Sequence, residues 1–106
     1  MEKSIETYYK KLDNYYDSNE RLIQYPSKRP MRIIALIKIA EQIDANRKYA
    51  EKEINEIIRA NIAFEDIEFI RREMYQYKFL GRLRDGSEYW VESDWRNTYV
   101  EYIRED

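Results

Sequence analysis

The pair Asp85-Gly86 lies between two short runs, residues 79–84 and 87–91, in which polar and apolar side chains alternate. An Asp-Gly pair favours the tight turn between antiparallel strands, because glycine adopts a positive φ without steric cost. Alternation on both sides of such a pair is the strongest short-range signal for a hairpin. The sequence therefore predicts a β-hairpin near the C-terminal end of the chain.

Helical periodicity dominates the residues before this hairpin. Apolar side chains recur three and four positions apart in residues 4–17, 31–43, 51–62 and 66–78. Residues 31–43 are apolar on more than one side, so we expect that helix to pack against two neighbours, one of them the N-terminal helix. The expected fold is mainly α with a small β-hairpin.

The ends of these helices carry recognisable signals. Ser4 is a plausible N-cap for the first helix, and Pro30 suits the start of the second. Ser93 can cap a short helix that carries Trp95 and Tyr99 on one side. The chain of 106 residues is long enough for one compact domain with short extensions.

Helix, helix and hairpin in this order form the skeleton of a winged helix, a fold that most often binds nucleic acid. We therefore expect a winged-helix-like domain over residues 25–92. Residues 1–24 add an N-terminal amphipathic helix and a connection, and residues 93–106 add a C-terminal helical extension.

The composition excludes several kinds of site. The chain has no Cys and no His, which removes disulfides, thiolate metal sites and the commonest general base. Its two glycines, Gly81 and Gly86, cannot form a glycine-rich phosphate loop. We expect no enzyme activity, no metal and no cofactor. No apolar run is long enough to span a bilayer, and charged residues follow Met1, so a cytoplasmic protein is the simplest interpretation.

Several separated segments resemble one known family. The matching pieces occur in the same order over roughly residues 25–92. They are Tyr25-Pro26-Ser27-Lys28, Tyr49, Glu51-Lys52-Glu53-Ile54-Asn55, Asp66, Ile70-Arg71-Arg72, Leu80, Arg82, Gly86 and Tyr89-Trp90. The chain thus resembles domain of unknown function 2087, a small bacterial domain often attached to helix-turn-helix regulators. The resemblance implies a winged-helix-like fold and an association with transcription regulation, and it implies no established chemistry.

One position departs from the pattern of that family. Ala50 stands where the family usually has Ser or Thr, which would form a capping box with Glu53. Glu53 can still reach back to the start of its helix, but the side-chain cap at position 50 is lost. This loss lowers local helix stability by about 1 kcal/mol.

The candidate DNA-binding residues lie on the last long helix and on the hairpin. They are Arg71, Arg72, Gln76, Arg82 and Arg84. Arginine and glutamine side chains at such positions can meet a phosphate or a base edge. In the alternative interpretation, Arg71 and Arg72 pair with Glu68, Glu73 or the acids of the hairpin, and Arg82 and Arg84 are solvent-facing residues of an edge hairpin.

Two features argue against tight DNA binding. Glu65, Asp66 and Glu68 gather at the start of the helix, where they suit the helix dipole but would face phosphates in a groove. The central segment, residues 25–92, is also close to neutral, whereas DNA-binding domains are usually basic.

The first helix carries a tyrosine-rich face that suits an interface. Its members are Tyr8, Tyr9, Leu12, Tyr15 and Tyr16. This face either mediates a homodimer or another protein contact, or it covers the core of its own domain. Elsewhere we expect Tyr49 and Tyr89 to pack together under the hairpin, and Asn55 to satisfy buried backbone groups.

Two functional hypotheses follow. The first is a non-enzymatic winged-helix module that binds DNA or regulates transcription as a dimer. The second is a protein-interaction module, or a small phage-type inhibitor protein, that uses the same fold. A continuous basic stripe around Arg72 and Arg82 would favour DNA, and exposed Phe69 and tyrosines would favour a protein partner.

Overall fold

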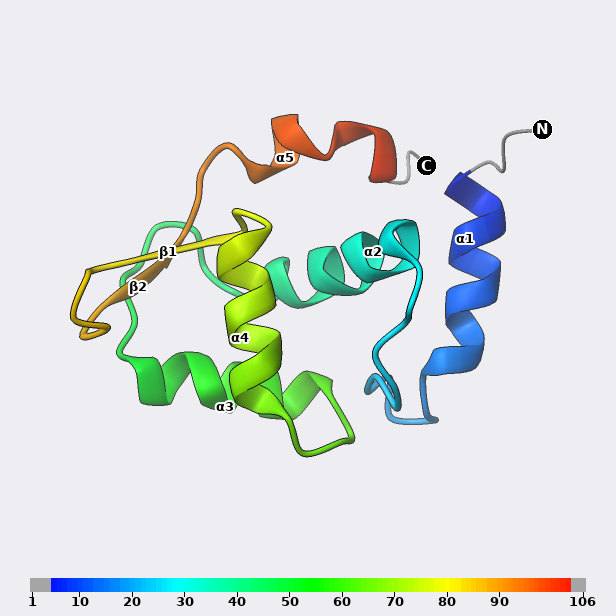
Figure 1. The fold of residues 1–106 in the computed structure, drawn as a ribbon, viewed down its shortest axis with the longest axis horizontal. Coiled ribbons are helices and arrows are strands. Elements are labelled where there is room, and N and C mark those ends of the chain that lie inside the picture. Colours follow the sequence, from blue (N-terminus) through cyan, green and yellow to red (C-terminus); the bar gives the residue numbers. More distant parts are fainter. Residues whose placement is uncertain (1–4, 104–106) are drawn as a thin grey trace.

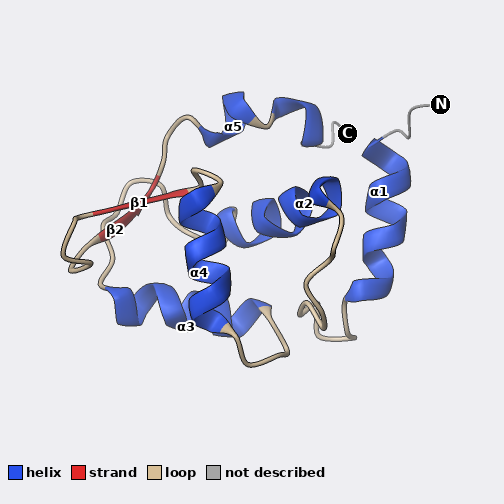
Figure 2. Cartoon of the chain, viewed as in Figure 1, coloured by secondary structure: helices blue, strands red, loops and turns tan. Residues whose placement is uncertain are grey.

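The computed structural model describes residues 5–103 and shows a mainly helical chain with one two-stranded antiparallel hairpin, as the sequence predicts (Figure 2). The hairpin and α1 lie at opposite ends of the molecule (Figure 1). The elements in chain order are α1 (Ile5–Leu12), η1 (Asp13–Tyr15), α2 (Arg29–Ala40), α3 (Glu51–Asn61), α4 (Ile67–Gln76), β1 (Leu80–Arg82), β2 (Tyr89–Val91), α5 (Trp95–Thr98) and η2 (Val100–Tyr102). Ser4, the expected cap of the first helix, lies outside the described residues.

Helix α2 forms the centre of the core. It contacts α1 and α3, which confirms that its apolar residues serve two neighbours. The helix begins at Arg29, with Pro30 in its first turn, and ends before Glu41. It is therefore shifted toward the N-terminus relative to the expected range 31–43. Its buried residues are Met31, Ile33, Ile34, Ala35, Leu36, Ile37, Ile39 and Ala40.

The first helix is shorter than the expected range 4–17. It ends at Leu12 and continues as a 3-10 turn, because the backbone then pairs with the connection that precedes α2. The carbonyl of Tyr15 accepts a hydrogen bond of 2.7 Å from the amide of Ile23. Tyr16 forms a β-bridge with Leu22, which in turn bridges to Ile62. These contacts replace further helical hydrogen bonds.

The tyrosine-rich face, which continues from α1 through η1 to Tyr16, covers the core of its own chain. Leu12 is fully buried, and the four tyrosines are partly buried against the same core. The Tyr9 hydroxyl donates a hydrogen bond of 2.9 Å to the carbonyl of Tyr102, and the Lys38 ammonium lies 4.6 Å from the centre of the Tyr16 ring. The helix therefore caps its own domain, one of the two roles considered for it.

The hairpin turns at Asp85-Gly86 as expected, but its strands are shorter than predicted. Arg82 pairs with Tyr89. Beyond this pair the loop is closed by the Gly86 amide, which donates to the Leu83 carbonyl at 2.9 Å, and Gly86 has a φ of +77°. The Asp85 carboxylate accepts hydrogen bonds from the amide and the hydroxyl of Ser87, which draws those groups out of the strand ladder.

A two-residue bridge fastens the hairpin to the helices. The backbones of Tyr49, just before α3, and Tyr89 in β2 exchange hydrogen bonds of 2.8 and 2.7 Å. Both side chains are buried, as expected for residues that pack under the hairpin. The start of α3 and strand β2 are thereby held side by side.

The C-terminal segment packs onto the same core. The ring of Tyr99 stacks on Phe79 with 4.8 Å between ring centres, and its hydroxyl donates to the carbonyl of Tyr77 at 2.7 Å. The expected cap at Ser93 is wrong, because Asp94 precedes the helix and its carbonyl accepts the amide hydrogens of Asn97 and Thr98. No helix within residues 5–103 has the length and apolar content needed to cross a lipid bilayer.

Candidate functional site

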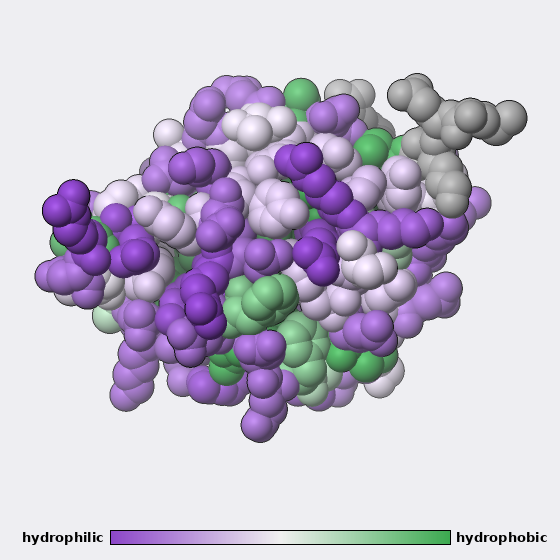
Figure 3. Space-filling view, in the orientation of Figure 1, coloured by the Kyte–Doolittle hydropathy of each residue, from purple (hydrophilic) through white to green (hydrophobic). Residues whose placement is uncertain are grey.

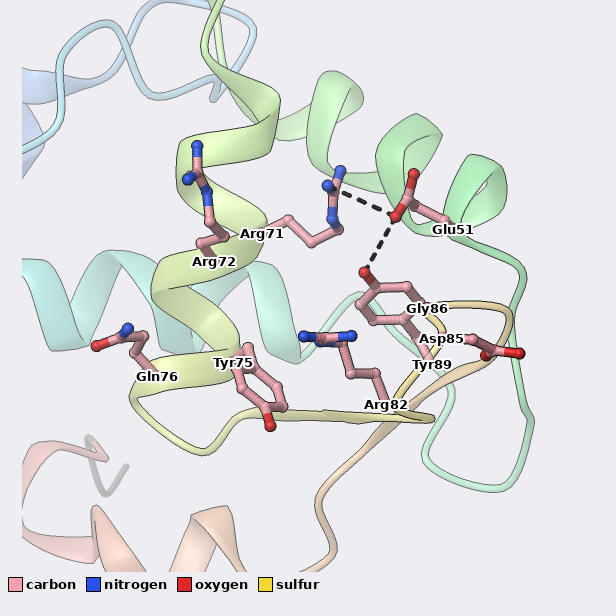
Figure 4. A pocket seen from close by; sticks show the side chains of 9 residues that line it. All are labelled: Glu51, Arg71, Arg72, Tyr75, Gln76, Arg82, Asp85, Gly86 and Tyr89. Atoms are coloured by element: carbon pink, nitrogen blue, oxygen red, sulfur yellow. Dashed lines mark hydrogen bonds and ion pairs between the residues drawn. The ribbon is translucent and has the colours of Figure 1, made fainter.

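A hollow of about 400 Å³ lies between α4, the start of α3 and the hairpin (Figure 4). It contains four of the five predicted DNA-binding residues, and the fifth, Arg84, is exposed on the hairpin outside it. The lining residues are Glu51, Arg71, Arg72, Tyr75, Gln76, Arg82, Asp85, Gly86 and Tyr89.

Arg71 is the most buried cation of this hollow. Its side chain is 13% exposed, and its Nη1 donates a hydrogen bond of 2.6 Å to Oδ1 of Asn55. Its Nη2 lies 3.6 Å from Oε1 of Glu51. The expected partners Glu68, Glu73 and the hairpin acids are therefore wrong for Arg71, because its side chain points from α4 toward α3. Asn55 likewise binds this side chain instead of buried backbone groups.

Glu51 connects three elements through a single carboxylate oxygen. Its Oε1 faces Arg71 of α4 and accepts a hydrogen bond of 3.2 Å from the hydroxyl of Tyr89 in β2. Glu51 lies in the first turn of α3, where the helix dipole favours a negative charge. Its side chain is 48% exposed, so it can leave this position without unpacking the core.

Arg82 faces Arg71 across the hollow (Figure 4). Its guanidinium carbon lies 5.0 Å from the centre of the Tyr75 ring, a cation–π contact. Its Nη1 donates to the carbonyls of Leu83 and Arg84, each at 3.2 Å. Within residues 5–103 no carboxylate lies within ion-pair distance of Arg82. A guanidinium held in this way keeps donors available for an external anion.

Arg72 and Gln76 lie on the outer side of α4, pointing away from Arg71 and Arg82 (Figure 4). The Nη2 atom of Arg72 lies 3.3 Å from Oε1 of Glu68, and both side chains are largely exposed. This is the local pairing that the sequence offered as an alternative to a DNA contact. An exposed ion pair of this kind contributes less than about 1 kcal/mol, so a stronger anion can replace Glu68.

The hollow carries a small net positive charge, because its lining includes three arginines and the two carboxylates of Glu51 and Asp85. The hydrogen bonds from Ser87 hold the pKa of Asp85 below its ordinary value, so this carboxyl is ionised at neutral pH. Among the described residues no group of His, Cys, Asp or Glu could hold a metal ion. The arrangement suits the reversible binding of an anionic group.

Residues 21–91 match the family described as an uncharacterized protein conserved in bacteria (DUF2087). The chain belongs to this family. No curated protein matches the chain, and no solved structure matches it. The DUF2087 segment runs from the connection before α2 to the end of β2, so it contains every residue that lines the hollow.

A second polar cluster of the DUF2087 segment explains why Glu73 does not reach Arg71. The Tyr25 hydroxyl donates to Oε1 of Glu73 at 2.9 Å, and Nη1 of Arg32 lies 3.8 Å from the same oxygen. Burial and this bond to Glu73 raise the pKa of Tyr25 above its ordinary value. The Tyr25 ring also meets Phe69 edge-on, with 5.4 Å between ring centres.

Sequence reasoning missed the roles of Glu51, Asn55 and Tyr89 in the hollow. One available signal was the spacing of Glu51 and Asn55, which places both on the same face of α3. All three residues also belong to segments that carry the resemblance to DUF2087. Their common partner, Arg71, became evident only once α3 and α4 were packed together.

Proposed function

We propose that this protein is a DNA-binding module of the kind used in transcription regulation. The order α2, α3, α4 and hairpin is that of a winged helix, with α4 as the recognition helix and the hairpin as the wing. The pairing of α3 with α4 and the Tyr49–Tyr89 bridge support this assignment, because they fix the wing beside the recognition helix.

The observation that carries the proposal is the position of Arg82. It lies opposite Arg71, beside Tyr75, and has no carboxylate partner in the part of the chain that the structure describes. Guanidinium groups bind phosphate oxygens through paired hydrogen bonds, and this geometry favours arginine over lysine. A backbone phosphate between α4 and the wing would meet both arginines.

The acids at the start of α4 determine the kind of binding that we expect. Glu65 and Glu68 are exposed, so a phosphate near this end of the helix would meet negative charge. We therefore propose that the protein holds the DNA backbone with the C-terminal half of α4 and the wing. Such contacts position a protein on DNA but carry little sequence information.

A salt titration with a random-sequence duplex tests this proposal. Arg82→Ala combined with Arg84→Ala should weaken binding and flatten the dependence of log K on log salt by about one unit per lost phosphate contact. Arg59→Ala combined with Arg96→Ala removes the same charge from exposed pairs outside the hollow and serves as the control. A parent protein that binds no duplex at low salt would overturn the proposal.

Arg72 allows a separate test of sequence preference. If it leaves Glu68 to contact a base, Arg72→Ala should reduce discrimination between preferred and random duplexes by about 1–3 kcal/mol. If it contacts only phosphate, all duplexes should weaken equally. The comparison needs a preferred sequence, which selection from a random duplex pool would supply.

A hollow with several apolar side chains in its lining favours a second candidate function, binding of a protein partner. It lies at the connection between α3 and α4, has a volume of about 420 Å³ and is lined by Ile62, Ala63, Phe64 and Ile67 together with three charged residues. Apolar surface also gathers on the face of the molecule that carries α4 (Figure 3).

Arg21 and Arg59 in the lining of this hollow pair with Asp17 and Glu56, so the exposed acids at the start of α4 favour a partner with a basic, amphipathic segment. Glu65 and Asp66 are exposed, and no cation lies within ion-pair distance of either in residues 5–103. Photocrosslinking from position 64 would identify such a partner. Its Kd should then rise at least tenfold on Phe64→Ser, whereas Val100→Ser, which alters exposed apolar surface elsewhere, should leave the Kd unchanged.

A homodimer through α1 also remains a proposal. Tyr8 and Tyr9 of α1, with Tyr15 and Tyr16 in and after η1, are only partly buried in their own chain and could contribute to such an interface, whereas Leu12 is buried. Sedimentation equilibrium at high micromolar concentration measures whether the protein is a monomer or a dimer. A monomer would leave α1 with its capping role alone, and a dimer lost on Tyr8→Ser would support the interface.

A further inference from the structure

We infer that Glu51 is an internal counter-ion of the α4–hairpin hollow, and that it and a phosphate group compete for Arg71. The inference deepens the proposed function, because it concerns how the same hollow is regulated. It also applies to inorganic phosphate, so it can be tested without DNA.

The geometry of Arg71 supports this competition. One edge of its guanidinium is held by Asn55 at 2.6 Å, whereas the other edge faces Glu51 at 3.6 Å, beyond the length of a good hydrogen bond. The first contact fixes the direction of the side chain. The contact with Glu51 offsets the charge of the Arg71 guanidinium but does not fully use the hydrogen-bond donors on Nη2. An anion that approaches Nη2 directly would therefore bind Arg71 more strongly than Glu51 does.

The two partners differ in their freedom to move. Arg71 is enclosed between α3, α4 and Tyr89, with 13% of its side chain exposed. Glu51 is 48% exposed, and its carboxylate can rotate into solvent at small cost. Binding of an anion should therefore displace Glu51 and leave Arg71 in place.

Displacement of Glu51 would also release the Tyr89 hydroxyl. This hydroxyl donates to the same carboxylate oxygen that faces Arg71, at 3.2 Å. Once free, it can donate to the incoming phosphate. Arg71, Arg82 and Tyr89 would then surround one anionic group, with the hairpin supplying two of the three donors.

A purely structural role for Glu51 predicts the opposite behaviour. If its carboxylate only ties α3 to α4 and β2, its removal should loosen the hollow and weaken anion binding. Removal of the Glu51 carboxylate should therefore raise the phosphate affinity if Glu51 is a counter-ion, and lower it if its role is purely structural.

The decisive experiment compares Glu51→Gln with Glu56→Gln. Both changes remove one negative charge from α3, but Glu56 is exposed outside the hollow and pairs with Arg59. Isothermal titration with inorganic phosphate and with pyrophosphate gives the affinities. We expect Glu51→Gln to tighten binding about three- to tenfold, the effect of removing one partly exposed like charge at close range. Glu56→Gln should change it less than about twofold, since salt screens distant charges.

Further variants identify the donors. Tyr89→Phe should leave the fold intact and reduce the gain seen in the Glu51→Gln background, because the hydroxyl can no longer bind the phosphate. Urea unfolding of each variant shows whether the variant is still stably folded. Equal or weaker phosphate binding by a stably folded Glu51→Gln protein would overturn the inference.

The failure of this inference and the failure of the proposed function give different results. Phosphate binding that Glu51→Gln enhances, without any binding of duplex DNA, would support the counter-ion and overturn the DNA-binding proposal. Duplex binding that Glu51→Gln leaves unchanged would support DNA binding and overturn the counter-ion.

Discussion

Arg71 on α4 donates a hydrogen bond of 2.6 Å to the side-chain oxygen of Asn55 on α3. This bond crosses the interface of the two helices and orients the most buried cation of the hollow. Removal of Asn55 would leave a largely buried guanidinium without its acceptor, which costs more than the loss of an exposed bond.

Asn55→Ala should therefore lower the free energy of unfolding by about 1–3 kcal/mol and weaken phosphate binding at the hollow. Asn61→Ala is a matched control, because Asn61 is in the same helix but donates to the Ile57 carbonyl within it. Urea denaturation measures both effects. Equal losses of stability in the two variants would contradict a special role for the bond to Arg71.

Ala50→Ser should stabilise the protein. The residue has the extended backbone of an N-cap, and its amide already donates to the Glu53 carboxylate at 2.9 Å. Alanine has no side-chain acceptor, so only half of a capping box is present. A serine oxygen can accept the Glu53 amide and should add about 0.5–1 kcal/mol, measurable as a raised midpoint of urea denaturation. Ala60→Ser, near the other end of α3, should give no gain.

Gly81→Ala should disturb the hairpin. A Cβ at this position would contact the Trp90 indole, 2.6 Å from its Cε2, and the Glu92 carboxylate. Both side chains must shift, and we expect a loss of about 1–3 kcal/mol, as for other overpacked sites. The indole N–H signal of Trp90 in NMR spectra should move, while that of Trp95 on α5 should stay. An unchanged Trp90 signal would show that the indole does not cover Gly81.

Asp85 should give the hairpin an acid-sensitive contribution to stability. Its pKa in the folded protein is held below the ordinary 3.8 by hydrogen bonds from Ser87. Folding therefore favours the ionised form of Asp85. The stability that this carboxylate adds to the folded protein is fully present at pH values above the ordinary pKa and is lost as the pH falls through the lowered pKa. The pKa of Asp17 is lowered too, so the parent must be compared with Asp85→Asn.

The difference in unfolding free energy between the parent and Asp85→Asn should shrink as the pH falls from about 5 to 2, because only the parent titrates at this site. Chemical denaturation at several pH values provides the measurement. A difference that stays constant over this range would show that Ser87 does not stabilise the carboxylate.

Much of the fold could be predicted from local patterns. The periodic apolar residues of α2, α3 and α4 were sufficient to place these helices, and Asp85-Gly86 predicted the hairpin and the position of its turn. These features depend on side-chain spacing and on the backbone freedom of glycine, both of which are local. The family resemblance also located the segment that the DUF2087 match covers.

The ends of elements depended on contacts that local patterns do not contain. The periodicity of residues 4–17 continues past Leu12, but the helix stops there because Tyr15 and Tyr16 pair with the connection before α2. The tyrosines of α1 illustrate the same limit. Their amphipathic spacing predicted a buried face, and only the packed chain showed that this face covers the domain's own core.

The sequence by itself determined which residues are charged, which helix carries Arg71 and Arg72, and that Arg82 stands on a hairpin. Tertiary structure alone decided which charges meet. Glu51 and Arg71 are twenty positions apart, and they face each other because apolar side chains pack α3 against α4. Packing depends on the shape of the whole core, whereas helix and turn formation depend on neighbouring residues, so the hollow and its counter-ion could not be deduced from spacing.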